Sequence, residues 1–191
     1  MATSRDLTAW QKHGPVFASA HGGAFEDAWT KSGAIVCEVV AGRLVAKQIN
    51  GVFWMLWGEN SVYMATSLDL LAWTPLLSPD APEYQGRPDQ PKSTLQGLRP
   101  LVVFGPRRGA FDSSLVEPGP PAVLTKSGIV FIYNSKNRWC NEARDGRCRG
   151  GENDPTTPPG TYSAGQVLLD ASDPTKVLNR TATSFFKPQM K

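Results

Sequence analysis

The sequence is poor in the residues that bind transition metals. It holds three cysteines and two histidines among 191 residues, and no cysteine pair has the spacing of a zinc site. His13 and His21 are too isolated to supply the missing ligands. The sequence therefore does not favour a cysteine–histidine zinc site, and we expect no metal and no other cofactor, although a carboxylate-bound ion is left open.

Long apolar runs and a strong charge of one sign are also missing. No stretch approaches the roughly 18 apolar residues that span a bilayer, and residues 1–17 lack the apolar core of a secretion signal. The net charge of +3 is too small to indicate the basic stripe that nucleic-acid binding needs. The sequence predicts neither a membrane nor a nucleic-acid partner, and it leaves localisation and oligomeric state open.

The three cysteines do not define the redox compartment. Cys37 lies in an apolar run and is expected to be a buried small hydrophobe. Cys140 and Cys148 flank a polar loop and would close a short disulfide in an oxidising compartment, or stay as two thiols in the cytosol. Together with the glycosylation sequon at Asn179, this pair favours an exported parent protein.

Several catalytic motifs are absent. There is no Walker-type phosphate loop, dinucleotide fingerprint, nucleophile elbow or zinc-binding histidine pair around a glutamate. Nucleotide chemistry and serine hydrolysis therefore have no support. What the sequence does contain is carboxylates set among aromatic residues and prolines, an arrangement typical of sugar sites, where rings stack on the sugar and acids move protons.

An internal repeat is the strongest signal in the chain. Residues 2–10 read Ala-Thr-Ser-Arg-Asp-Leu-Thr-Ala-Trp and residues 65–73 read Ala-Thr-Ser-Leu-Asp-Leu-Leu-Ala-Trp, so seven of nine positions match. A short aromatic strand at 51–57 leads into a second strand at 62–65, and in the same order a strand at 128–133 leads into one at 162–168. We expect each Asp to cap a turn through backbone N–H groups and each Trp to cover a joint between sheets.

These features predict an all-β fold of short antiparallel strands. A period near 60 residues with about four strands is typical of propeller blades, which bury their faces by stacking. Since propellers close with about four to eight blades, we expect residues 1–191 to form one incomplete β-propeller domain with about three blades. The alternative is that several chains associate to cover open sheet edges. Proline-rich residues 78–100 and arginine-rich residues 134–161 are expected to be loop insertions.

Glu117 is the most distinctive candidate site residue. It follows an apolar strand and precedes Pro118-Gly119-Pro120-Pro121, whose restricted backbone would hold its side chain in place. Asp112 lies five residues upstream and is expected to line the same site. The competing interpretation of Glu117 is an ordinary turn carboxylate that bonds to backbone amides.

Two other strand ends carry candidate residues. Trp29 and Lys31 precede the apolar strand that contains Cys37, and Trp57 and Glu59 end the aromatic strand at 51–57. Trp29 and Trp57 would offer stacking surfaces, and Lys31 would line the site as a substrate-binding residue. The competing interpretations are a solvated start of a strand for Lys31 and an ordinary hairpin acid for Glu59.

The order of these motifs resembles the five-bladed β-propeller glycosidases, and it is most similar to glycoside hydrolase family 130, the β-mannoside phosphorylases and β-mannosidases. The resemblance covers nearly the whole chain outside the two insertions. It implies a carbohydrate partner and activity on β-mannosides or related glycosides. The motifs that carry it are Ser-x-Asp-Leu-x-x-Trp at both repeats, Lys31-Ser32-Gly33-Ala34-Ile35, residues 51–59, Glu117-Pro118-Gly119-Pro120-Pro121, Tyr162-Ser163-Ala164-Gly165 and residues 168–178.

The chain also departs from the family pattern. The family's general acid lies in an Asp-Pro-Arg motif, whereas Asp154-Pro155 and Asp173-Pro174 are both followed by Thr here. We therefore expect a truncated form that lacks its acid, so that enzymatic activity is left open. The alternative function is a noncatalytic carbohydrate-binding propeller fragment, and a third reading is an aberrant product without a stable fold.

The resemblance also bears on the type of reaction. Family phosphorylases resemble Lys-Asn-Ala where this chain has Lys31-Ser32-Gly33, and they carry a basic residue near the position of Glu59. A carboxylate there would repel phosphate and favour water, which implies hydrolysis over phosphorolysis. Glu117 is the first candidate for the catalytic base of an inverting hydrolysis, and Glu59 is the second.

Overall fold

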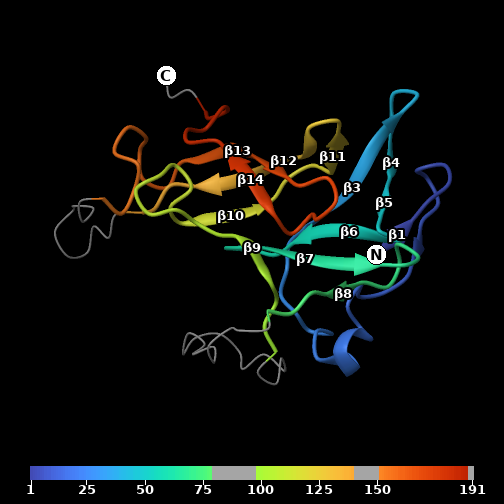
Figure 1. Cartoon of the computed structure of the whole chain (residues 1–191). Helices are drawn as coiled ribbons and strands as arrows, with labels where there is room; N and C mark the ends of the chain where they lie inside the picture. Colours follow the sequence, from blue (N-terminus) through green and yellow to red (C-terminus); the bar gives the residue numbers. More distant parts are fainter. Residues whose placement is uncertain (79–97, 140–150, 189–191) are drawn as a thin grey trace.

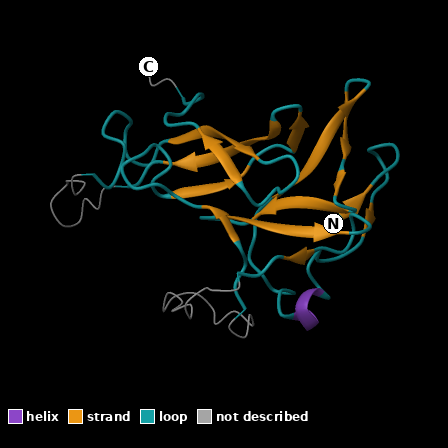
Figure 2. Cartoon of the chain, in the orientation of Figure 1, coloured by secondary structure: helices purple, strands orange, loops and turns teal. Residues whose placement is uncertain are grey.

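The computed structural model describes residues 1–78, 98–139 and 151–188, and it is all-β (Figure 2). Within these ranges the one helical segment is the short 3-10 turn η1 (Ala20–Gly23). The strands are β1 (Ala2–Thr3), β2 (Gln11–Lys12), β3 (Gly33–Val40), β4 (Arg43–Ala46), β5 (Gln48–Ile49), β6 (Val52–Trp57), β7 (Val62–Ser67), β8 (Thr74–Pro75), β9 (Val102–Phe104), β10 (Leu115–Pro118), β11 (Ala122–Thr125), β12 (Gly128–Lys136), β13 (Tyr162–Leu169) and β14 (Val177–Arg180).

Two groups of paired strands, which we call units, make up most of the fold. The first runs β3–β6–β7–β8, and in the second β12 pairs with β10 and β11 on one side and with β13 on the other, followed by β14. A short parallel contact between β11 and β3, at Ala122 and Val36, connects the units, which lie one above the other in Figure 1. With the separate β1–β2 pair, they form the incomplete propeller-like fold expected from the sequence.

The two copies of the repeat form the same turn. In each, the carboxylate of Asp6 or Asp69 accepts hydrogen bonds of 2.8 and 2.9 Å from the backbone N–H groups two and three residues later. These bonds, the largest influences on both groups, lower the pKa of each carboxyl below its ordinary value. The expected turn is confirmed. Trp73 is buried with 1% of its surface exposed, whereas Trp10 is 56% exposed.

Both faces of β6 and β7 are buried, which explains why β6 is apolar along its whole length. Successive side chains of a strand point to opposite faces, so Leu56 packs in one core cluster and Trp57 in the other. The first cluster contains residues from both units, and the second joins residues 17–25, which include η1, to β6 and β7. The largest side chains of the first are Leu56, Met64, Phe104, Phe111, Phe131 and Tyr133, and those of the second are Phe17, Phe25, Met55, Trp57 and Trp73.

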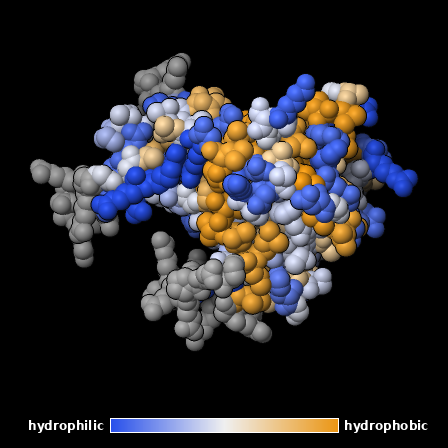
Figure 3. All heavy atoms as spheres, viewed as in Figure 1, coloured by the Kyte–Doolittle hydropathy of each residue, from blue (hydrophilic) through white to orange (hydrophobic). Residues whose placement is uncertain are grey.

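Apolar side chains remain at the surface as well. The hairpin of β3 and β4, which extends away from the sheet in Figure 1, exposes Val39, Val40, Leu44 and Val45 by 44–61%. Figure 3 shows apolar side chains gathered over the middle and upper right of this face. Such exposure is unusual for an isolated soluble domain and marks surfaces suited to further contacts.

The predicted strands are confirmed. Most of the predicted insertion at 78–100 lies outside the described residues, as do residues 140–150 of the predicted insertion at 134–161. β6, β7, β12 and β13 cover the four predicted strands, although β12 continues to Lys136 and so includes the first residues of 134–161. Cys37 is buried and unpaired, as expected. Cys140 and Cys148 lie outside the described ranges.

Candidate functional site

Lys31 and Glu59 meet because the strands that precede and follow them are paired. β3 and β6 are antiparallel with Gly33 opposite Trp57, so the residues two positions beyond this pair come together at the same end of the sheet. The Lys31 Nζ lies 2.7 Å from the Glu59 Oε1. The register of one strand pair therefore creates an ion pair between residues 28 positions apart.

Trp29 completes this contact from the other side. Its indole N–H donates a 2.5 Å hydrogen bond to the Glu59 Oε2, so both carboxylate oxygens of Glu59 have a donor. The Trp29 side chain is nevertheless 80% exposed, which leaves its ring accessible. Next to it, the backbone N–H of Gly58 donates to the Thr30 Oγ1 at 3.2 Å and holds the two strand ends together.

The pKa values of Lys31 and Glu59 are both shifted in the direction that keeps the two groups ionised. The Lys31 hydrogen bond is the largest influence on Glu59 and lowers the pKa of that carboxyl, although partial burial opposes it. The same bond raises the pKa of Lys31, to which the charges of Glu117 and Tyr162 also contribute. Both partners are therefore charged at neutral pH.

Glu117 lies beside this pair. The Ser32 hydroxyl donates a 3.1 Å hydrogen bond to the carbonyl of Pro118, which joins the residue after Lys31 to the residue after Glu117. The Glu117 Oε2 is buried and has no hydrogen-bond partner among the described residues. A buried carboxylate oxygen without a donor is rare in folded proteins, and it marks a place where a ligand or water would be bound.

Trp57 and Asp112 lie apart from this cluster. Trp57 is 3% exposed and packs against Phe17, Phe25 and Tyr63 in the second core cluster. Its indole N–H has no partner among the described residues. Because Trp57 follows the inward alternation of β6, its ring has no open face on which a sugar could stack.

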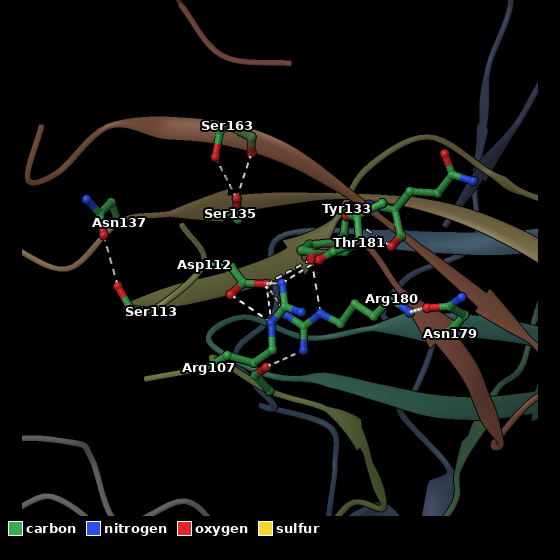
Figure 4. Close-up of polar contacts among 12 residues, drawn as sticks. Arg107, Asp112, Ser113, Tyr133, Ser135, Asn137, Ser163, Asn179, Arg180 and Thr181 are labelled. Carbon is green, nitrogen blue, oxygen red and sulfur yellow. Dashed lines mark hydrogen bonds and ion pairs between the residues drawn. The ribbon is translucent and has the colours of Figure 1, made fainter. Parts of the chain in front are cut away.

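Asp112 is fully buried in an ion network (Figure 4). Arg107 and Arg180 contact its Oδ2 at 2.8 and 2.5 Å, and the Tyr133 hydroxyl donates to the same oxygen at 2.8 Å. Burial, the largest influence, raises the pKa of Tyr133 to about 12. Gly165 is required beside this network because a Cβ there would collide with the Tyr133 ring. The structure thus brings together Trp29, Lys31, Glu59 and Glu117, and it places Asp112 elsewhere.

Sequence reasoning missed Trp139 and Tyr162, which lie close to the cluster, and it considered Lys136 only as one of the basic residues of the 134–161 insertion, for which the sequence allows either a solvated loop or a rim for an anionic or sugar ligand. Lys136, Trp139 and Tyr162 stand at or near the ends of β12 and β13, and the Lys136 Nζ lies 5.5 Å and 5.0 Å from the centroids of the Trp139 and Tyr162 rings. Tyr162 was quoted only as part of a strand motif. No sequence signal marked them, because Lys136 and Tyr162 come together only through the antiparallel register of β12 and β13.

Within the described ranges no cluster of three or more His, Cys, Asp or Glu side chains could hold a metal ion. No helix in those ranges is long and apolar enough to cross a bilayer. The cluster offers two carboxylates, one lysine and an exposed indole. In an incomplete β-propeller, this set is compatible with a glycosidase-like protein.

Comparison with solved structures supports this class. A glycosyl hydrolase from Bacteroides ovatus is 41% identical with a TM-score of 0.79, and the match covers 100% of this chain and 45% of that one. A second structure represents the GH130 family of mannoside phosphorylases, which contains glycoside hydrolases that target β-1,2 mannosidic linkages in Candida mannan. It is 41% identical with a TM-score of 0.80, over 100% of this chain and 45% of that one.

A more distant structure shows the same fold. The β-1,2-mannobiose phosphorylase from Listeria innocua is 22% identical with a TM-score of 0.59, over 99% of this chain and 38% of that one. No family model matches the chain, and no curated protein sequence matches it. The chain resembles glycoside hydrolase family 130 along its whole length, as its motifs predicted, and it spans about half the length of the solved structures it matches.

Proposed function

We propose that this chain binds β-mannosides or related glycosides at the cluster of Trp29, Lys31, Glu59 and Glu117 and takes part in their hydrolysis. The observation that carries the proposal is the convergence of these four side chains at one end of the β3–β6 pair, beside β10. The 40–42% identity to glycosidases along the whole chain supports the substrate class.

The geometry suits a neutral sugar. Glu59 is ionised and Lys31 remains 52% exposed, so acceptor and donor atoms stand side by side for neighbouring sugar hydroxyls. The exposed Trp29 ring offers an apolar face for the C–H groups of a pyranose. Trp57 and Asp112 have no part in this proposal, because both side chains are buried away from the cluster.

The charge balance supports hydrolysis over phosphorolysis. Lys31 is neutralised by Glu59, and Glu117 adds a further negative charge close to the same lysine. A phosphate group needs uncompensated cations, and it would be repelled by two adjacent carboxylates. Water has no such requirement.

Glu117 suits the role of base better than Glu59 does. Both oxygens of Glu59 already accept hydrogen bonds, and its pKa is lowered, which makes it a weaker proton acceptor. One oxygen of Glu117 is buried without a partner among the described residues. That oxygen is free to accept a proton from a water molecule that attacks the anomeric carbon.

Replacing Glu59 with Gln is expected to weaken the binding of methyl β-mannoside about tenfold or more. The substitution removes the charge that holds Lys31 and Trp29 and that strengthens hydrogen bonds to sugar hydroxyls. Isothermal titration of the purified chain measures the effect. Glu38→Gln is a matched control because Glu38, on β3, forms a similar ion pair of 3.0 Å with Lys47, which lies between β4 and β5. Equal affinities of the two variants would contradict the proposal.

The affinity for methyl β-mannoside is expected to stay constant from pH 7 to pH 5. The folded-state pKa of Glu59 lies below its ordinary value of 4.5, so its charge, and the binding that depends on it, is lost only as the pH falls through that lowered pKa. Titrations at successive pH values test this expectation. The Glu59→Gln variant should show no such acid transition, and a loss of wild-type binding above pH 5 would point to another group.

A further inference from the structure

A second group of residues that could contact a sugar, one lysine and two aromatic side chains, lies close to the cluster. Lys136, Trp139 and Tyr162, which we call the aromatic shelf, form a compact group in which the lysine ammonium contacts both rings. Trp139 is 62% exposed and Tyr162 is 48% exposed. No carboxylate in the described ranges forms an ion pair with Lys136. The shelf therefore presents two partly exposed rings and a donor group to the solvent.

The shelf is held in place by the backbone. Lys136 and Tyr162 are directly opposite each other in the β12–β13 pair, so their side chains emerge together on one face. The Trp139 ring packs against the backbone of Gly160, where any Cβ would collide with it and where the φ angle is +78°. Only glycine fits both requirements. Such fixed rings lose little conformational freedom when a ligand stacks on them.

The shelf shares a sheet face with the catalytic candidate. In the β10–β12 pair Leu115 is opposite Lys136 and Glu117 is opposite Asn134. Side chains of paired residues, and of residues two apart on one strand, point to the same face, so Glu117, Lys136 and Tyr162 all emerge on one side. Tyr162 is also close enough to Lys31 to raise the pKa of the lysine. The shelf thus lies on the same face as Glu117 and close to Lys31 of the cluster.

We propose that the aromatic shelf binds a second sugar ring of a β-linked oligosaccharide whose first ring lies at Trp29, Lys31 and Glu59. This inference rests on the proposed function and adds a length preference to it. A pyranose ring stacks its C–H groups on an indole or phenol face, and the Lys136 ammonium donates to the hydroxyls at its rim. A single sugar at the cluster would leave the shelf empty.

Titration of the full chain with methyl β-mannoside and with methyl β-mannobioside tests the inference. The two-ring ligand is expected to bind about fivefold to tenfold more tightly, as one aromatic stacking contact allows. Trp139→Ala should abolish that gain and leave the affinity for the single ring unchanged. Trp10→Ala is the matched control, because Trp10 is also exposed, by 56%, and lies on the separate β1–β2 pair.

A glycine pair provides a second test that keeps both rings. Gly160→Ala should displace the Trp139 ring and reproduce the lost gain, whereas Gly51→Ala should not. Gly51 has a similar φ of +81°, so the backbone strain is matched, but a Cβ there meets nothing within 4 Å. Thermal unfolding of both variants confirms that each is folded at the titration temperature.

The outcomes separate this inference from the proposed function. If methyl β-mannoside binds, Glu59→Gln weakens that binding, and methyl β-mannobioside binds no more tightly, then the role of the shelf is overturned and the proposed function stands. A loss in Trp139→Ala that equals the loss in Trp10→Ala also overturns the role of the shelf. Absence of binding by both sugars overturns the proposed function and the shelf together.

Discussion

Replacing Asp112 with Asn should lower the free energy of unfolding by about 3–5 kcal/mol, the range measured when one partner of a buried ion pair is removed. The side chain of Asp112 is fully buried, and the Arg180 side chain that contacts it is only 10% exposed. The amide cannot neutralise the two arginines, so their charges would stay in the protein without compensation. Urea unfolding followed by circular dichroism measures the change.

The network also holds the segment that precedes β10 against the end of β14. Arg107 donates to the carbonyl of Thr181 at 2.8 Å, and Arg180 donates to that of Gly105 at 2.7 Å, so the carboxylate joins the end of β14 to the segment before β10. Asp27→Asn is a suitable control, since Asp27 is exposed, and it should change stability by less than about 0.5 kcal/mol. Similar values for the two variants would contradict a structural role for Asp112.

Replacing Glu117 with Gln is expected to reduce the hydrolysis of an aryl β-mannoside by about 10²- to 10⁴-fold, the usual contribution of a general base. Gln cannot accept the proton of the attacking water but keeps nearly the same shape. A dinitrophenyl leaving group is the appropriate substrate, because it departs without protonation and so does not require the general acid. Release of dinitrophenolate by the purified chain gives the rate.

Two controls distinguish hydrolysis from phosphorolysis and test whether the effect is specific to Glu117. Inorganic phosphate should leave the wild-type rate unchanged, whereas a marked increase with phosphate would indicate phosphorolysis. Glu38→Gln should retain the wild-type rate, since Glu38 lies in the separate pair with Lys47. If methyl β-mannoside binds, but no product is released and Glu117→Gln binds as the wild type does, the noncatalytic carbohydrate-binding function is correct instead.

The strands and turns of this protein could be predicted because their causes are local. The Ser-x-Asp-Leu-x-x-Trp turn closes through hydrogen bonds within six residues, and both copies form it with the same distances. The all-apolar β6 was visible in the sequence as well. The reason for that pattern, burial on both faces between two clusters, came only from the packing.

The candidate site was only partly predictable. Lys31 and Glu59 stood at the ends of predicted strands, but the sequence did not say that these strands are paired with a register that joins them. Trp29 and Trp57 looked equivalent as aromatic residues near strand ends. Alternation along β6 buries Trp57 at 3% exposure, whereas Trp29 lies outside the strand and is 80% exposed.

By itself, the sequence determined the all-β class, the repeated turn and the resemblance to propeller glycosidases, because strand periodicity and turn hydrogen bonds act over a few residues. Only the tertiary structure decided what each carboxylate does. Asp112 and Glu117 are only five residues apart. Asp112 is enclosed by Arg107 and Arg180. Glu117 lies beside Lys31, and its Oε2 has no hydrogen-bond partner among the described residues. The role of a charged group depends on the neighbours that distant strands bring to it, and those neighbours are set by register and packing.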